Sequence, residues 1–261
     1  MRILITNDDG INAPGLAALE RIAREVAGDG GEIWTVAPAF EQSGVAHATS
    51  HAHPTMIAKL ASRRWAAEGS PADCVLAAVH HVMKGSPPDL ILSGVNRGNN
   101  SAENAVYSGT LGAAMEGAMQ GIRSIALSQY IGPGNRKIEN RFEASERHGT
   151  SVVRRLLDDA NWDDAPYGLF YNVNFPPTSA SGVRGLRVTS QGFRKIGAHR
   201  VEPYVSPNGR RYMWISGTGQ EVGTGAGTDA QANVDGYISV TPMRADLTAH
   251  ETLEGLRERL E

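Results

Sequence analysis

Short oxygen-bearing side chains follow three predicted strands, at the positions where α/β proteins commonly place their chemistry. Asp8 and Asp9 come directly after the first strand, Gln42 and Ser43 follow the second, and the run Asn96–Asn100 follows a later one. Ligands of open α/β sheets bind beyond the carboxyl ends of the strands, so we expect these segments to meet at one edge. Carboxylate, amide and hydroxyl oxygens are the ligands that Mg²⁺ and Mn²⁺ prefer. The pattern therefore predicts a magnesium or manganese site.

The run Asn7–Gly10 also has a simpler interpretation as a turn, because Asn, Asp and Gly are all turn residues. Taken alone, the segment favours that interpretation. Its coincidence with the other two strand ends favours the metal site. The repulsion between two adjacent carboxylates then becomes a reason to bind a divalent cation, and Gly10 lets the chain turn away beneath them.

A possible phosphate site lies at Ser108, Gly109 and Thr110, where a helix rich in alanine and methionine is predicted to begin. Free backbone N–H groups and the helix dipole attract anions at such a position, and Gly109 would let a phosphate approach closely. A plain N-cap is the alternative. A metal site and an anion site on one edge together indicate phosphoryl chemistry. The chain lacks GxxxxGK[ST], which excludes a P-loop NTPase.

Other reactive residue types carry weaker signals. His47, His51 and His53 have a spacing that could bind a transition metal, but a zinc site needs further ligands, so a solvated loop near the mouth of the site is preferred. Cys74 falls within a predicted helix and reads as a buried thiol rather than a nucleophile.

The first half of the chain alternates predicted strands with predicted helices. Short apolar runs predict strands at Arg2–Thr6, Glu32–Ala37, Thr55–Lys59, Asp89–Val95 and Arg123–Ser128. Helices are predicted between them, for example after Pro14 and after the capping box that begins at Ser70. Strands that alternate with crossover helices predict an α/β fold with a Rossmann-like, doubly wound, mostly parallel sheet.

From about residue 183 the pattern becomes β-rich. Strands are predicted at Leu186–Ser190, Arg211–Ser216 and Tyr237–Thr241, and a turn is predicted at Pro203–Gly209. Thr248–Glu251 has the form of a capping box, which would start a leucine-bearing tail helix. We expect residues 1–182 to form the catalytic core and residues 183–261 to form a C-terminal region whose apolar surfaces need a partner.

The overall composition is that of a globular protein. The chain has 261 residues with 41% hydrophobic and 20% charged residues, and its net charge of −3 predicts no general attraction to nucleic-acid polymers or acidic membranes. One cysteine excludes an intrachain disulfide, and the N-terminus lacks the long apolar region of a signal peptide. No stretch is long and apolar enough to span a bilayer, so a cytoplasmic location is the expectation.

With these motifs in order, the sequence resembles the SurE family of stationary-phase survival nucleotidases. The matching stretches are "RILITNDDGI", "VAP…QSG", "GSPADCV", "DLILSGVNRGNN", "YSGTLGAAMEGAM", "NVNFP" and "TDAQANVDGYISVTP". They extend over most of the chain, and "SGVNRG" followed by "YSGTLGAAMEG" is highly specific. The resemblance implies a metal-dependent phosphatase of nucleoside 5′- and 3′-monophosphates, in some members also of short polyphosphate.

The resemblance also implies roles for particular residues. The metal ligands of the family correspond to Asp8, Asp9, Ser43 and Asn96, with one Mg²⁺ or Mn²⁺ per subunit. Asn96 and the segment Ser108–Thr110, with Gly109 between, correspond to the phosphate-binding positions. Asp8, Asp9 and Asn96 are the expected catalytic residues, with a water or one aspartate as the nucleophile. A homodimer or homotetramer that exchanges its C-terminal region is implied as well.

Three departures from the family bear on substrate preference. Ala39 and Phe40 stand where many relatives have a carboxylate after "VAP", the loop after Ser43 is rich in histidine, and Ser190 stands where an arginine is common. Two other functions remain as alternatives. A non-catalytic nucleotide sensor could use the same site, whereas a Rossmann oxidoreductase is disfavoured because no glycine fingerprint follows the first strand.

Overall fold

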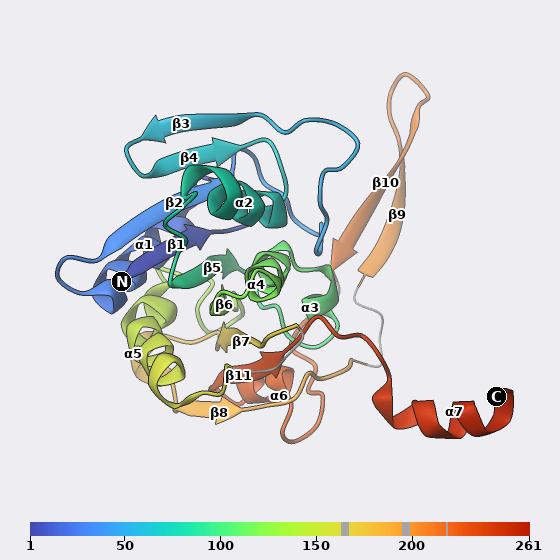
Figure 1. Cartoon of the computed structure of the whole chain (residues 1–261). Coiled ribbons are helices and arrows are strands. Elements are labelled where there is room, and N and C mark those ends of the chain that lie inside the picture. The colour runs from blue at the N-terminus through green and yellow to red at the C-terminus, as the bar shows by residue number, and fades with distance from the viewer. Residues whose placement is uncertain (163–166, 195–198, 218) are drawn as a thin grey trace.

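The structure, a computed structural model, describes residues 1–162, 167–194, 199–217 and 219–261. A twisted sheet with helices on both sides forms the body, and a β-hairpin and the C-terminal helix extend away from it (Figure 1). No described helix combines the length and the hydropathy that crossing a bilayer requires.

The central sheet has nine strands in the order β3-β4-β2-β1-β5-β6-β7-β11-β8. Their bounds are β1 Arg2–Thr6, β2 Glu32–Pro38, β3 Ile57–Ala61, β4 Arg64–Ala67, β5 Leu90–Arg97, β6 Ser124–Gln129, β7 Phe170–Phe175, β8 Leu186–Val188 and β11 Ile238–Met243. The neighbours from β4 through β7 all pair in parallel, and only the β3–β4 and β7–β11 pairs are antiparallel. The predicted doubly wound, mostly parallel fold is therefore confirmed.

Helices cover both faces of this sheet. Their bounds are α1 Pro14–Ala27, α2 Pro71–Ala77, α3 Asn104–Tyr107, α4 Gly109–Met119, α5 Glu143–Asp159, α6 Asp229–Val234 and α7 Leu253–Leu260. Alternate strand residues divide between the faces, because successive side chains point to opposite sides. Ile3 and Ile5 lie in one buried cluster with Leu19 of α1 and Val153 of α5, whereas Leu4 lies in another cluster with residues of α2 and α4.

The first half agrees closely with the strand and helix predictions. The strand Arg2–Thr6 is confirmed as predicted, and the Ser70 capping box is present with both of its hydrogen bonds. The strand expected at Asp89–Val95 instead runs from Leu90 to Arg97, so Asn96 lies inside β5. The strand β4 and the short helix α3 were not predicted.

Two expectations for the C-terminal region are wrong. The turn expected at Pro203–Gly209 is partly strand, because β9 (His199–Val205) pairs with β10 (Arg211–Gly217) as an antiparallel hairpin. The Thr248 capping box does not start the tail helix. A 3₁₀ turn covers His250–Thr252, and α7 begins at Leu253 without a side-chain cap. The boundary at residue 182 stays a prediction, and β8 and β11 beyond it extend the central sheet.

Candidate metal and phosphate site

A tight turn presents the two aspartates at the carboxyl end of β1. The Asn7 side chain closes this turn, because its Nδ2 donates to the Gly10 carbonyl at 2.9 Å and its Oδ1 accepts from the Gly10 N–H at 3.2 Å. Gly10 has a φ of +102°, which side chains other than glycine rarely tolerate. The turn interpretation and the site interpretation of this segment are therefore compatible, since the turn positions both carboxylates.

Asp8 is buried, with 5% of its surface exposed, and the start of α4 holds its carboxylate. The Thr110 hydroxyl donates to Oδ1 at 2.7 Å, and the Thr110 N–H donates to Oδ2 at 3.2 Å. Burial raises the pKa of Asp8 to about 6, and the charge of Asp9 adds to this rise while the Thr110 hydrogen bonds oppose it. A buried carboxylate whose pKa stays raised despite two hydrogen bonds is stabilised further by a nearby cation.

Gly109 lies where α4 closely approaches the aspartate turn. A Cβ at this position would lie 3.0 Å from the Cβ of Asp8 and 3.1 Å from the Cγ of Pro71. The glycine thus accommodates the Asp8 side chain in the structure, and its predicted contact with phosphate stays a prediction. Ser108 caps the same helix by accepting from the Leu111 N–H at 3.1 Å.

Asp9 is less buried than Asp8 and is held from the other side, by β5. The Arg97 N–H donates to its Oδ2 at 3.0 Å. Burial raises the pKa of Asp9, and the charge of Glu41 raises it further, whereas the hydrogen bond and charge of Arg97 lower it. The two neighbouring aspartates therefore face different elements, α4 and β5, and both carry electrostatic reasons to bind a cation.

Asn96 and Ser43 supply uncharged oxygens. One extra residue of β5 lies between Ser93 and Asn96 relative to β6, and such a bulge re-aims the side chains that follow it. Asn96 Nδ2 donates to the Gly98 carbonyl at 3.0 Å, which orients the amide and leaves its Oδ1 as the acceptor that can serve a cation. The Ser43 hydroxyl donates to Glu41 Oε1 at 2.7 Å, so its oxygen keeps acceptor capacity.

One hollow of about 240 Å³ gathers most of the predicted residues. Those in its wall are Asp8, Asp9, Ser43, Asn96 and Ser108. Gly109 and Thr110 do not line it, and Thr110 lies behind Asp8 with its side chain fully buried. We call this hollow the site pocket.

The pocket wall also contains residues that were not assigned roles from the sequence. They are Glu41, Gly44, Arg97, Gly98, Asn99, Asn100, Asn104, Tyr107, Gly217 and Gln220. Arg97–Asn100 belong to the run of polar residues that begins at the end of β5, so their type and place gave a usable signal. Gly217 and Gln220 come from the distant C-terminal region, and no spacing in the sequence indicates their approach.

The oxygen donors fit a hard divalent cation. Two carboxylates with raised pKa values, a hydroxyl oxygen and an amide oxygen line the same pocket, which is the donor chemistry of Mg²⁺ or Mn²⁺. Among the described residues, no group of three His, Cys, Asp or Glu side chains could hold a metal ion. The fit therefore depends on Ser43 and Asn96 in addition to the two aspartates.

The three loop histidines do not gather. His47 Nε2 lies 2.7 Å from Oε2 of the buried Glu116 on α4, and His51 Nε2 lies 2.8 Å from the Thr49 hydroxyl. His53 is exposed. His47 thus ties its loop to α4, which agrees with the preferred interpretation of these residues as a loop beside the site.

Two further residues discussed from the sequence lie outside the site pocket. Cys74 is fully buried, and burial raises the pKa of its thiol, which agrees with a structural role. Ser190 lines a separate, larger hollow of about 810 Å³ together with His47. Although Ala39 stands where relatives have a carboxylate, Glu41 places one in the wall of the site pocket.

The fold and the pocket define an α/β protein with an oxygen-rich site at the carboxyl ends of parallel strands. Comparisons with known proteins agree with this class. The family described as "Survival protein SurE" matches residues 3–198, so the chain belongs to the SurE family. It is 64% identical over 256 residues to the "5'-nucleotidase SurE" of Cereibacter sphaeroides, with 98% of each chain covered.

Other relatives cover the whole chain. The "5'-nucleotidase SurE" of Ruegeria pomeroyi is 64% identical over 260 residues, with 100% of each chain covered. The crystal structure of the SurE protein from Aquifex aeolicus matches with a TM-score of 0.79 at 34% identity, with 99% of each chain covered. Both the sequence family and the three-dimensional fold are thus shared over the full length.

Proposed function

We propose that the protein is a metal-dependent 5′-nucleotidase that hydrolyses nucleoside 5′-monophosphates to nucleoside and phosphate. The observation that carries this proposal is the convergence of Asp8, Asp9, Ser43 and Asn96, from three separate segments, on one pocket. Relatives 61–64% identical over nearly the full length carry the name 5′-nucleotidase, which supports the same activity here. A cytoplasmic location is proposed with it.

The metal would be one Mg²⁺ or Mn²⁺ per subunit, held by these four residues. When bound, it supplies electrostatic stabilisation of the charge that develops on the phosphoryl oxygens. Thr110 and the Arg97 N–H orient the two carboxylates, so that little rearrangement is needed when a cation binds. Asn96 and Ser108, at the pocket wall, are proposed to bind the phosphate, whereas the Thr110 N–H is taken by Asp8 and Gly109 lies behind the wall.

Proton transfer is assigned to the aspartates. One of the two, Asp8 or Asp9, is proposed as the general base that takes a proton from an attacking water. Asp9 is more accessible and could instead attack phosphorus directly. Quenching the reaction in acid and searching for a phosphorylated aspartate by mass spectrometry distinguishes the two routes. The proposal extends to nucleoside 3′-monophosphates and short polyphosphate, because the assigned residues address only the phosphate.

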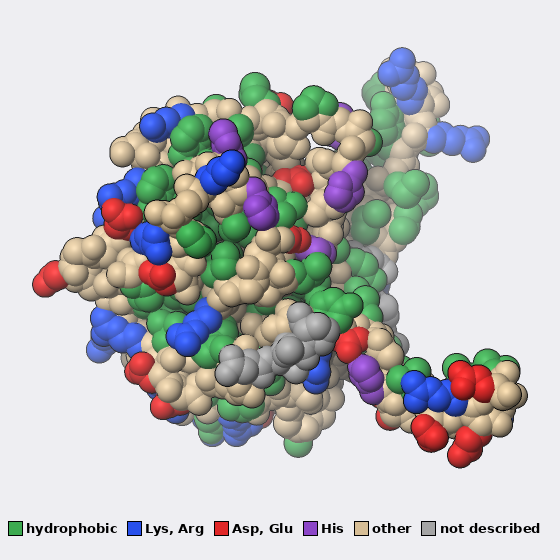
Figure 2. Space-filling view, viewed as in Figure 1, with side chains coloured by type: hydrophobic (Ala, Val, Ile, Leu, Met, Phe, Trp, Pro, Cys, Tyr) green, Lys and Arg blue, Asp and Glu red, His purple; other side chains and the backbone are tan. Residues whose placement is uncertain are grey.

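We also propose that the protein acts as a homodimer or homotetramer. The hairpin β9–β10 exposes Tyr212, Met213, Trp214 and Ile215, each with more than half of its surface in solvent. Figure 2 shows hydrophobic side chains on this projecting segment and along the C-terminal helix. Exposed apolar groups gathered on two projections are typical of surfaces that a second copy covers.

Phosphate release from nucleoside monophosphates tests the enzymatic proposal. We expect release by the purified protein with Mn²⁺ or Mg²⁺ and none after addition of a chelator. A nucleotide sensor would bind the same compounds, as measured by calorimetry, without releasing phosphate. Absence of release across acid to alkaline pH, with metal present, would contradict the nucleotidase.

A further inference from the structure

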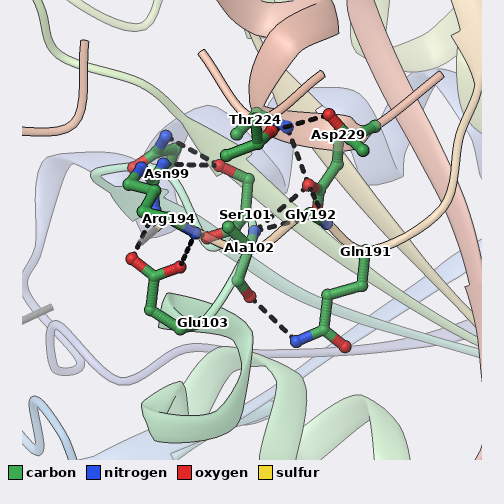
Figure 3. Close-up of polar contacts among 11 residues, drawn as sticks. Asn99, Ser101, Ala102, Glu103, Gln191, Gly192, Arg194, Thr224 and Asp229 are labelled. Atoms are coloured by element: carbon green, nitrogen blue, oxygen red, sulfur yellow. Dashed lines mark hydrogen bonds and ion pairs between the residues drawn. The ribbon is translucent and has the colours of Figure 1, made fainter. Parts of the chain in front are cut away.

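Three consecutive residues beside the site pocket are anchored by the C-terminal region (Figure 3). Ser101, Ala102 and Glu103 directly follow Asn99 and Asn100, which line the pocket. Besides local hydrogen bonds, each of them has partners that lie 89 to 127 positions later in the chain. The pocket wall is therefore fixed by contacts that are remote in sequence.

Asp229 holds the middle residue of the three. Its side chain is fully buried at the start of α6, and its carboxylate accepts from the Ala102 N–H at 3.0 Å. It also accepts from the N–H groups of Gly192 at 2.9 Å and Ala230 at 2.7 Å. The Ala102 carbonyl accepts from Gln191 Nε2 at 3.0 Å, so both backbone groups of Ala102 are held.

Arg194 holds Ser101 and Glu103, the residues on either side of Ala102. It is 4% exposed, its backbone N–H donates to Glu103 Oε2 at 3.0 Å, and its Nη1 donates to Glu103 Oε1 at 3.1 Å. The same guanidinium donates to the Ser101 carbonyl at 3.3 Å and to the Ser101 hydroxyl at 3.4 Å. One side chain thus fixes two loop residues in a defined geometry, which a lysine could not do.

The Ser101 hydroxyl connects Arg194 to Asn99, a residue of the pocket wall. Asn99 Nδ2 donates to the Ser101 hydroxyl oxygen at 2.9 Å. Within the described part of the chain the Asn99 side chain has no other hydrogen bond, and its Oδ1 is buried without a partner. The orientation of Asn99 in the wall therefore depends on Ser101 and, through it, on Arg194.

This arrangement is more elaborate than stability requires. Burying charged groups is unfavourable before pairing, and apolar side chains of similar shape often stabilise a fold equally well. Ala102 also has a φ of +53°, a conformation uncommon for residues other than glycine, and such strain persists only where surrounding contacts enforce it. The buried charges and the strained backbone of Ala102 are both explained if turnover requires a fixed geometry of this loop.

We propose that Asp229 and Arg194 are positioning residues for turnover, which fix Ser101–Glu103 and thereby the orientation of Asn99 in the wall of the site pocket. Neither residue lines the pocket, so both act through the loop. The inference rests on the proposed nucleotidase function. Of the four proposed metal ligands, Asp8, Asp9 and Ser43 lie in other segments and Asn96 lies within β5, so none belongs to Ser101–Glu103 and the loop can be disturbed without removing them.

The test compares Asp229→Asn, Arg194→Met, Arg194→Lys and Ser101→Ala with the wild type. We expect kcat/KM for a nucleoside 5′-monophosphate to fall about 10-fold or more in Asp229→Asn and Arg194→Met, since small misplacements of site groups have large kinetic effects. Arg194→Lys should fall between Arg194→Met and the wild type. The rise in Tm on Mn²⁺ addition should remain close to that of the wild type.

Thr150→Val is the matched control. It removes the hydrogen bond of 2.7 Å from the buried Thr150 on α5 to the exposed Glu25 on α1, and neither residue lines the site pocket. We expect this variant to lose stability and to keep its kcat/KM. Hydrogen exchange at the Ala102 amide gives a readout independent of activity, and it should accelerate in Asp229→Asn and not in Thr150→Val.

The possible outcomes distinguish a failure of the proposed nucleotidase function from a failure of the positioning role. A wild type without phosphate release contradicts the proposed function, while the exchange at Ala102 still tests the anchoring. The positioning role is overturned if the wild type is active and Asp229→Asn and Arg194→Met fold and keep a kcat/KM within twofold of the wild-type value. Loss of Mn²⁺ binding in parallel with activity would overturn it too, because it would indicate general disorder. If the charged-residue variants do not fold, a folded Ser101→Ala with wild-type kcat/KM overturns the inference.

Discussion

Polar side chains crowd the pocket beyond β1, β2 and β5, whereas the hairpin β9–β10 carries large apolar side chains into solvent. In the pocket, Asp8 and Asp9 are each held by named donors of the same chain. On the hairpin, Trp214 and Met213 are each 67% exposed. One chain therefore supplies and orients the proposed donor set by itself, whereas the apolar surface of the hairpin is where we propose that a second copy packs.

The largest effect is expected from Asp9→Asn. The substitution removes one of two carboxylates from the donor set, so metal-supported phosphate release should fall by about 100-fold or more. The Tm of the metal-free protein should change little or rise, because burial and Glu41 oppose ionisation of Asp9. Wild-type turnover in this variant, measured with Mn²⁺, would show that the carboxylate assignment is wrong.

A smaller effect is expected from Thr110→Val, which keeps the shape of the side chain and removes the hydroxyl that donates to Asp8 at 2.7 Å. Turnover should fall about 10-fold through looser placement of the carboxylate. The pKa of Asp8 should rise, because this hydrogen bond lowers it. A pH–rate profile that does not move would contradict the role given to Thr110.

The metal should stabilise the protein more at pH 7 than at pH 5. The raised pKa of about 6 means that folded Asp8 keeps its proton at pH values where the unfolded chain has ionised. Ionising it therefore costs folding free energy as pH rises from about 4 through about 6. A cation offsets that cost only at pH values at which Asp8 has lost its proton. The Mn²⁺-induced rise in Tm should therefore become smaller below pH 6. An equal rise at both pH values would contradict this coupling.

The smallest effect on turnover is expected from removing residues 248–261. This truncation deletes α7 and leaves every residue of the site pocket in place. Light scattering after size-exclusion chromatography should show a weakened assembly, with kcat within about threefold of the full chain. An intact assembly would rule out the tail helix as an essential contact and direct attention to the hairpin.

Much of the first half could be predicted because each element follows a strong local rule. Buried apolar runs marked β1 and β5, and the Ser70 capping box marked α2. Strand ends also located the site, since parallel strands bring their carboxyl ends to one edge. The bulge before Asn96 was not predictable, because it depends on the register with β6.

The hairpin and the tail helix were harder to predict because their residues are mostly exposed, and burial imposes no pattern on them. The hairpin strand β9 contains Pro203 and polar residues and reads as a turn. Thr248–Glu251 satisfies the capping-box pattern, yet Thr248 donates its N–H to Asp246 and the helix starts later. The contact between Asp229 and Ala102 spans 127 positions and exists only through the tertiary fold.

Diffraction at the manganese absorption edge, from crystals grown with Mn²⁺, tests whether these four residues bind the metal. We expect one anomalous peak per subunit in the site pocket, bonded to oxygens of Asp8, Asp9, Ser43 and Asn96. A peak at the loop histidines, or no peak in the pocket of a protein that releases phosphate with Mn²⁺, would contradict it.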